Sequence, residues 1–134
     1  ALTRGGLRAG VEALVSGVSL PVSVDVSVER VPAGVEATAY FVISEALTNV
    51  IKHAHAGRAS VMARVEHGEL RVEVHDDGVG GALGAHGTGL EGLEDRVAAL
   101  DGLLVLNSPP GEGTRVCALL PVPQENQPSG ASRR

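Results

Sequence analysis

A single long helix, predicted over residues 32–53, constrains the fold of this chain more than any other segment. Its apolar residues recur every three to four positions and form one stripe that can pack against a core. That stripe comprises Ala39, Ile43, Ala46, Leu47, Val50, Ile51 and Ala54. The opposite side carries Glu45, Asn49, Lys52 and His53, which fall within an arc of about 100° on an α-helix. A carboxylate, an amide and an ammonium on one face suit a metal ion and a phosphate chain.

Composition limits the remaining possibilities. The chain has 134 residues, the size of one domain, and a net charge of −5 with one Tyr, one Phe and no Trp. Negative charge and scarce aromatic residues oppose binding to nucleic acid. Cys117 is the single cysteine, which excludes an internal disulfide, and we expect it to be a small buried residue in a reducing compartment. No apolar run reaches the roughly 20 residues of a membrane span, so we expect no membrane segment.

Helical and alternating periods follow one another along the chain and predict the fold class. Helices are expected over 3–17, 32–53 and 88–102, and strands over 20–29, 59–66, 69–76, 103–107 and 114–120. This order predicts an α/β fold, a two-layer sandwich of a mixed, mostly antiparallel sheet against three helices. We expect one domain over residues 1–121 and a disordered tail over 122–134, which is rich in Pro, Gln and Ser. The chain begins in the middle of a helical pattern, so we expect it to be part of a larger protein.

Four short motifs occur in order across residues 45–114. Residues 45–53 read Glu-Ala-Leu-Thr-Asn-Val-Ile-Lys-His and resemble the asparagine box of the GHKL superfamily. Residues 76–80 (Asp-Asp-Gly-Val-Gly), 87–90 (Gly-Thr-Gly-Leu) and 111–114 (Gly-Glu-Gly-Thr) resemble its three glycine boxes. That superfamily contains sensor histidine kinases, type II topoisomerases, heat-shock chaperone ATPases and mismatch-repair ATPases.

Within the superfamily, the chain most resembles the ATP-binding catalytic domain of sensor histidine kinases of the nitrate/nitrite-sensor type. The asparagine box reads Glu-Ala-Leu-Thr-Asn with Lys-His-Ala following, and only residues 81–86 separate the first and second glycine boxes. The second box continues over 89–97 as Gly-Leu-Glu-Gly-Leu-Glu-Asp-Arg-Val. The resemblance covers roughly residues 1–121 and implies the Bergerat, or GHKL, ATP-binding fold.

The resemblance also implies a function. Such a domain binds ATP with Mg²⁺ and donates the γ-phosphate to a His on a separate dimerisation domain, and the full-length kinase acts on a response regulator. We expect a cytoplasmic domain, monomeric by itself and not active as a kinase without its phosphoacceptor domain; the full-length protein can still be membrane-anchored. Two alternatives stay open: an anti-sigma-factor-type serine protein kinase of the same fold, and a degenerate, non-catalytic ATP-binding or docking module.

The resemblance assigns three positions to the adenine end of the site. Asp76 would accept a hydrogen bond from the adenine amino group, and Gly78 and Gly80 would let the backbone approach the base. Thr114 would reach the adenine edge directly or through water. The structural alternatives are a turn-initiating Asp followed by turn glycines, and an ordinary strand Thr.

The asparagine box would hold the metal and the phosphates. Asn49 would place its side-chain oxygen on Mg²⁺, and Lys52 would neutralise phosphate charge. Glu45 matches the residue that polarises water in the hydrolases of the superfamily, and here we expect it to orient a magnesium-bound water. His53 would pack against the nucleotide. Surface positions for Glu45, Asn49 and Lys52, and a dipole-stabilised helix-terminal position for His53, are the alternatives.

The second glycine box would contact the phosphates through its backbone. Gly87, Thr88 and Gly89, continued by Leu90, would present N–H groups at the start of a helix, which Thr88 can cap. Arg96, two turns into that helix, would either touch the terminal phosphate or form a surface ion pair with a neighbour such as Glu91.

Overall fold

The computed structural model describes residues 6–28, 30–80 and 90–123, without the side chains of four of them: His53, Ala54, Leu90 and Glu91. The helices are α1 (Gly6–Ser16), α2 (Ala33–Asn49), the π-helix η1 (Val50–Ala54) and α3 (Leu90–Ala99). The strands are β1 (Val22–Ser27), β2 (Ala59–Glu66), β3 (Glu69–Asp76), β4 (Leu103–Asn107) and β5 (Thr114–Pro121).

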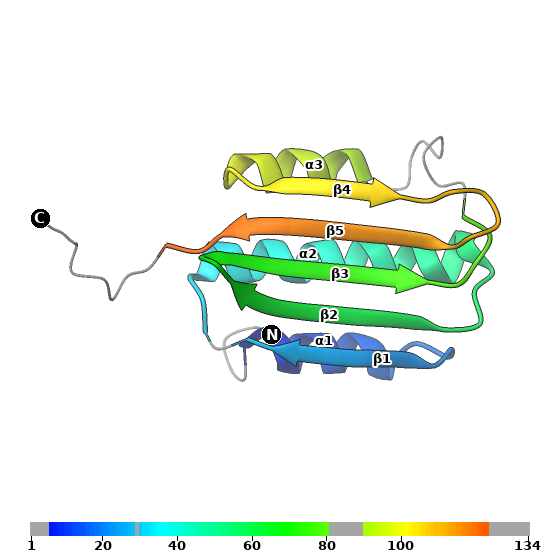
Figure 1. Ribbon diagram of the computed structural model, residues 1–134. Coiled ribbons are helices and arrows are strands. Elements are labelled where there is room, and N and C mark those ends of the chain that lie inside the picture. Colours follow the sequence, from blue (N-terminus) through cyan, green and yellow to red (C-terminus); the bar gives the residue numbers. More distant parts are fainter. Residues whose placement is uncertain (1–5, 29, 81–89, 124–134) are drawn as a thin grey trace, which may run out of the picture.

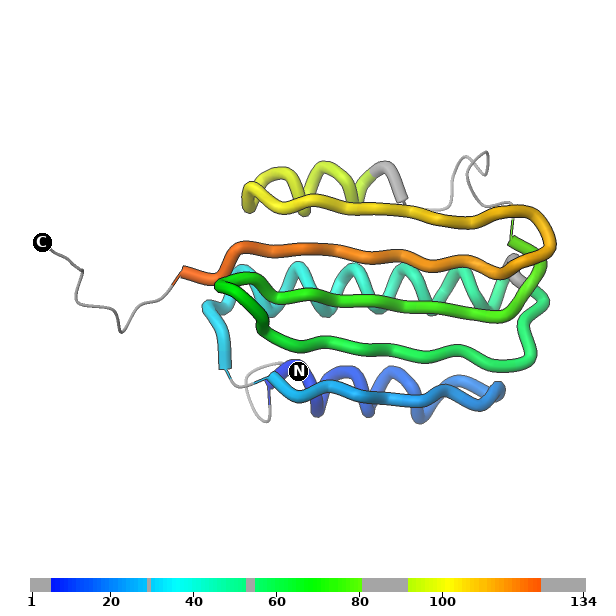
Figure 2. The backbone as a smooth tube through the Cα atoms, viewed as in Figure 1, coloured from blue at the N-terminus to red at the C-terminus, as the bar shows by residue number. Residues whose placement is uncertain are grey.

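The five strands form one mixed sheet in the order β1-β2-β3-β5-β4. Strand β1 pairs with β2 in parallel, and the other neighbours are antiparallel. The helices lie on one face of this sheet, with α1 behind β1, α2 behind the central strands and α3 beside β4 (Figures 1 and 2). The predicted two-layer α/β sandwich of a mostly antiparallel sheet and three helices is therefore confirmed.

Alternation along the strands places the core between the two layers. In β3, Leu70, Val72 and Val74 are buried toward the helices, because successive strand side chains point to opposite faces. The other face of the sheet carries charged residues that pair across strands, among them Arg64 with Asp25 at 3.1 Å. No helix within 6–28, 30–80 or 90–123 covers that face, so the charges remain in contact with water.

Helix α2 begins as predicted but ends differently. Pro32 precedes its first turn, where buried Glu36 accepts two hydrogen bonds from Arg30. Beyond Asn49 the chain continues as the π-helix η1, and His55 then adopts a left-handed conformation with φ 51°. The prediction that the apolar stripe packs against the core is wrong at Ile51, which is 57% exposed.

The sandwich has two contrasting ends (Figure 1). At the hairpin end, the β2–β3 turn at His67 and Gly68 lies near the start of α2. At the site end, α2 passes into η1, β3 and β4 end, and β5 begins. Asp76 and Thr114 pair at the site end, where β3 stops and β5 starts, so the first and third predicted glycine boxes meet there.

The predicted boundaries at residues 121 and 122 stay a prediction. The backbone N–H of Val122 still donates to the Gly68 carbonyl at 2.8 Å, and residues 124–134 of the predicted tail lie outside the described residues. Among the helices that are described, none has both the length and the apolar character needed to cross a bilayer.

Candidate functional site

One wall of the site is the face of α2 that looks toward α3. The guanidinium of Arg96 on α3 lies 4.1 Å from the centre of the Phe41 ring on α2, which places Phe41 on that face. Glu45 follows Phe41 by about one helical turn and Asn49 by about two, so the three share this side of the helix. Glu45 and Asn49 are half-buried. Arg96 thus stacks on a ring of α2, a contact that was not among the two predicted for it.

The π-helix changes where Lys52 lies relative to Asn49. A π-helix pairs residues i and i+5, so the arc predicted from α-helical spacing applies only through Asn49. Lys52 lies in η1 and is exposed, while the side chain of His53 lies outside the described residues. Short π-helical turns are frequent at functional sites, and this one begins directly after the predicted metal ligand.

Asp76 forms the floor of the site at the end of β3. It is 3% exposed, and its Oδ1 accepts a hydrogen bond from the backbone N–H of Gly78 at 2.7 Å. Within the described part of the chain, Oδ2 of Asp76 forms no hydrogen bond. A carboxylate oxygen left in this way can accept a hydrogen bond from a ligand.

Two glycines bring the adjacent loops into direct backbone contact. Gly80 has φ 69° and Gly113 has φ 79°, and both lie where a side chain would not fit. A Cβ at Gly80 would overlap the Pro109 carbonyl oxygen, and one at Gly113 would overlap that of Asp76. The close approach seen at Gly80 is to another loop of the protein, and its predicted approach to the base stays a prediction.

Ser108 is a site residue that the sequence reasoning missed. It is 1% exposed at the end of β4, and its hydroxyl lies 2.6 Å from the hydroxyl of Thr114. Thr114 in turn pairs with Asp76 across β3 and β5. The available signal was a Ser directly before Pro109-Pro110, because a polar residue that ends an apolar strand needs a partner.

Asp77 is the second missed residue. Its Oδ1 accepts hydrogen bonds from the backbone N–H groups of Gly57 at 2.8 Å and Arg58 at 3.0 Å. The bonds from Arg58 and then Gly57 hold the pKa of the Asp77 carboxyl below its usual value. The adjacent aspartates therefore differ: Asp76 is buried in the site, and Asp77 is exposed and bound to the chain that follows η1.

The second glycine box lies almost entirely outside the described residues. Gly87, Thr88 and Gly89 lie outside the described residues, and Leu90 is described only as the first backbone position of α3. Their predicted contacts with phosphate stay predictions.

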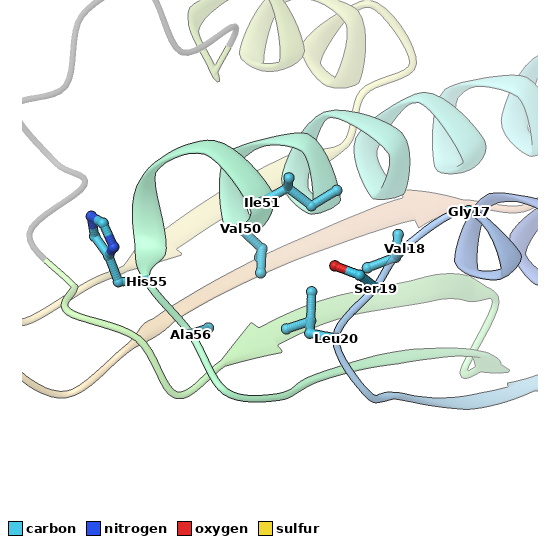
Figure 3. A pocket seen from close by; sticks show the side chains of 8 residues that line it. All are labelled: Gly17, Val18, Ser19, Leu20, Val50, Ile51, His55 and Ala56. Carbon is cyan, nitrogen blue, oxygen red and sulfur yellow. The ribbon is translucent and has the colours of Figure 1, made fainter.

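A shallow pocket of about 270 Å³ lies beside η1 (Figure 3). It is lined by Gly17, Val18, Ser19, Leu20, Val50, Ile51, His55 and Ala56. None of the predicted nucleotide-binding residues lines it, and Figure 3 shows it between η1 and the connection from α1 to β1. It is therefore distinct from the α2–α3 side of the site.

The residues gathered at the site end fit a magnesium nucleotide. Asp76 offers a buried acceptor for an amino group, and Asn49 offers an amide oxygen of the kind that Mg²⁺ prefers. Lys52 provides an exposed positive charge that can approach phosphate.

Comparison with known proteins identifies the family. Residues 34–124 match the family described as "Histidine kinase-, DNA gyrase B-, and HSP90-like ATPase". The chain is 31% identical to the sensor histidine kinase MctS of Rhizobium johnstonii, over 87% of this chain and 28% of the relative. It is 32% identical to the sensor histidine kinase YxjM of Bacillus subtilis, over 81% and 27%. The chain thus spans less than a third of these curated relatives.

Solved structures of histidine kinases resemble this chain as well. The blue-light activated histidine kinase EL346 of Erythrobacter litoralis superposes with a TM-score of 0.72 at 26% identity, covering 89% of this chain and 42% of that one. The ATP binding domain of PrrB from Mycobacterium tuberculosis gives a TM-score of 0.64 at 21% identity, over 88% and 92%, which supports the fold. The sequence-based family prediction is confirmed. This chain belongs to the histidine kinase-, DNA gyrase B- and HSP90-like ATPases, and the relatives that it resembles are sensor histidine kinases.

Proposed function

We propose that this domain binds ATP with Mg²⁺ at the site end and donates the γ-phosphate to a His on a separate dimerisation domain. The observation that carries the proposal is the buried Asp76 carboxylate, with Oδ1 on Gly78 N–H and Oδ2 available to a ligand. Thr114 lies directly across the strand pair. A buried acceptor beside a hydroxyl distinguishes an adenine amino group from a guanine carbonyl, because a carbonyl would leave the carboxylate unpaired.

The face of α2 supplies the groups for the charged part of the nucleotide. Asn49 would hold Mg²⁺ through its side-chain oxygen, Lys52 would neutralise phosphate, and Glu45 would orient a water of the metal. His53 and residues 87–90 would complete the contacts with the nucleotide, as the family resemblance implies. The bound metal supplies charge neutralisation on the phosphate oxygens, and this chain contributes position and electrostatics.

Titration calorimetry with a non-hydrolysable ATP analogue and Mg²⁺ tests the site. We expect Asp76→Asn to weaken binding by at least about tenfold. The Asn side chain would place an NH2 group where Oδ2 was, so that two hydrogen-bond donors, this group and the adenine amino group, would face each other. Asn49→Ala should lower the affinity for the magnesium nucleotide more than that for the metal-free nucleotide. Asp25→Asn, on the charged outer face, is the control and should bind like the wild type. Unchanged binding in both site variants would refute the assignment.

The acceptor residue needs a separate test. The domain, mixed with its own dimerisation domain and ATP labelled on the γ-phosphate, should transfer the label to protein. Acid should then remove the label, since phosphohistidine is acid-labile and phosphoserine is not. An acid-stable product would favour the serine kinase alternative, and absence of nucleotide binding would favour a docking module. We place the domain in the cytoplasm as a monomer, with a response regulator as the downstream partner of the full-length kinase.

A further inference from the structure

The side chain of Asp77 links the two segments that carry the site residues. Asp77 follows β3, and its Oδ1 accepts the backbone N–H groups of Gly57 and Arg58 at 2.8 and 3.0 Å. In return, the backbone N–H of Asp77 donates to the Arg58 carbonyl at 3.3 Å. The Arg58 guanidinium lies 3.9 Å from Oδ2. Three hydrogen bonds thus bind the chain after η1 to the chain before Gly78.

The chain after η1 leads into β2, whose Ala59 pairs with Asp76 of β3, and the Asp77 junction lies directly beside that pair. Ile51 and Lys52 are exposed, and the apolar support of the end of η1 is a small cluster formed by Val50 and Ala59 with Leu20, Val22 and Ala56. His55 ends the helix in a left-handed conformation, so the chain that follows turns away from the helix axis. Asp77 accepts the N–H groups of Gly57 and Arg58, the second and third residues after His55.

We propose that Asp77 is a positioning residue, which holds the helix end carrying Asn49 and Lys52 in register with the loop carrying Asp76 and Gly78. The inference rests on the proposed nucleotide site and assigns Asp77 no contact with the nucleotide. Asp76 and Asp77 are consecutive, so any shift of η1 relative to the loop moves the metal-binding side of the site against its adenine side. Hydrogen bonds from backbone N–H groups to a carboxylate are short-range and directional, which suits this role.

Two substitutions separate hydrogen bonding from charge. Asp77→Asn keeps Oδ1 as an acceptor, and Asp77→Ala removes it. In calorimetry with Mg²⁺ and a non-hydrolysable ATP analogue, we expect Asp77→Ala to weaken binding about tenfold, the equivalent of one charge-assisted hydrogen bond, and Asp77→Asn to stay within about twofold of the wild type. Asp25→Ala is the matched control, because Asp25 is also exposed and paired with an arginine but lies on the outer face.

A readout without nucleotide tests the junction itself. Amide hydrogen exchange over residues 50–58 should be faster in Asp77→Ala than in the wild type or Asp77→Asn, while unfolding in urea shows that each variant is folded. Faster exchange with weaker binding, rescued by Asn, supports the proposal. Unchanged affinity in a folded Asp77→Ala protein, or equal loss in both variants, would overturn it. A wild-type protein that binds no adenine nucleotide would instead contradict the proposed function.

Discussion

The hairpin end and the site end of the sandwich use glycine for different reasons (Figure 1). At the hairpin end, Gly68 has φ 77° and no atom within 4 Å of the position where its Cβ would lie. At the site end, Gly80 and Gly113 also have positive φ, but a Cβ on either would overlap a backbone carbonyl of another loop. The first kind of glycine shapes a turn, and the second kind lets two loops close against each other.

The two ends also differ in how their buried carboxylates are paired. Near the hairpin end, buried Glu36 is neutralised by Arg30 through two hydrogen bonds of 3.2 Å. At the site end, Asp76 is equally buried, yet its described partner is a single backbone N–H group. One end pairs its buried carboxylate with a cation of the protein, and at the other end the described partner is a backbone N–H group, which leaves room for the ligand contact that we propose. Measurements at the two ends can break or sharpen this contrast.

The largest difference should come from the glycines. We expect Gly113→Ala to lower the free energy of unfolding by about 3 kcal/mol or more, because the Cβ meets the Asp76 carbonyl and the backbone is left-handed. Gly68→Ala should cost only about 1 kcal/mol, the strain of positive φ alone. Urea unfolding of both variants measures this. Equal losses would remove the distinction between the two ends.

The buried pair at the start of α2 should matter for stability and not for the site. Arg30→Ala leaves the Glu36 carboxylate without this cation, and we expect a loss of about 2 kcal/mol in the free energy of unfolding. Nucleotide affinity of the folded variant should stay within about twofold of the wild type. The control is Arg8→Ala, which breaks an exposed ion pair with Glu12 and should cost less than about 0.5 kcal/mol. A Kd that rises in Arg30→Ala would show that the ends are coupled.

Ser108 should affect stability and binding together. Ser108→Ala removes the hydroxyl that lies 2.6 Å from the Thr114 hydroxyl, and we expect a loss of about 1 kcal/mol in stability. Because Thr114 then loses its fixed orientation beside Asp76, adenine nucleotide affinity should fall about threefold. Ser23→Ala, at an exposed position of β1, serves as the comparison in unfolding and calorimetry. If Ser108→Ala binds nucleotide as tightly as Ser23→Ala, Thr114 does not depend on Ser108.

The smallest effect should be the pH dependence due to Asp77. Hydrogen bonds from Arg58 and Gly57 lower its folded pKa below the unfolded value of about 3.9. The stabilisation is therefore present above the unfolded pKa and is lost as pH falls through the folded pKa. Unfolding in urea between about pH 6 and pH 3 should show the wild type losing its advantage over Asp77→Asn as the pH falls. A difference that does not change with pH would contradict this linkage.

Strand boundaries were the part of the fold most open to prediction. The predicted strands 59–66 and 69–76 match β2 and β3, because alternating apolar residues stop at the turn residue Gly68. The predicted strand 103–107 matches β4, a continuous apolar run that begins directly after Gly102. The end of α2 was not predictable in this way. The sequence pattern over Val50 to Ala54 continues the α-helical spacing and does not indicate the π-turn that the structure has there.

The candidate site was also predictable only in part from the sequence. Local motifs were sufficient to nominate Asp76, Asn49 and the glycines, and the family they predicted is confirmed, while their individual roles stay predictions. Three contacts escaped the sequence reasoning: Arg96 on Phe41, Ser108 on Thr114, and Asp77 on the chain after η1. Each joins different elements of the fold and rests on no local motif.

The sequence by itself determined the periods, the turn residues and the order of the four motifs, and these were enough for the layers, the strands and the family. Only the tertiary structure decided how the motifs meet. Asp76 is buried where the backbone at Gly113 packs against its carbonyl, and Asp77 is bound because the chain after η1 passes beside it. Neighbours in sequence thus receive opposite environments, since alternation along a strand fixes which face a side chain takes, and packing fixes what it meets there.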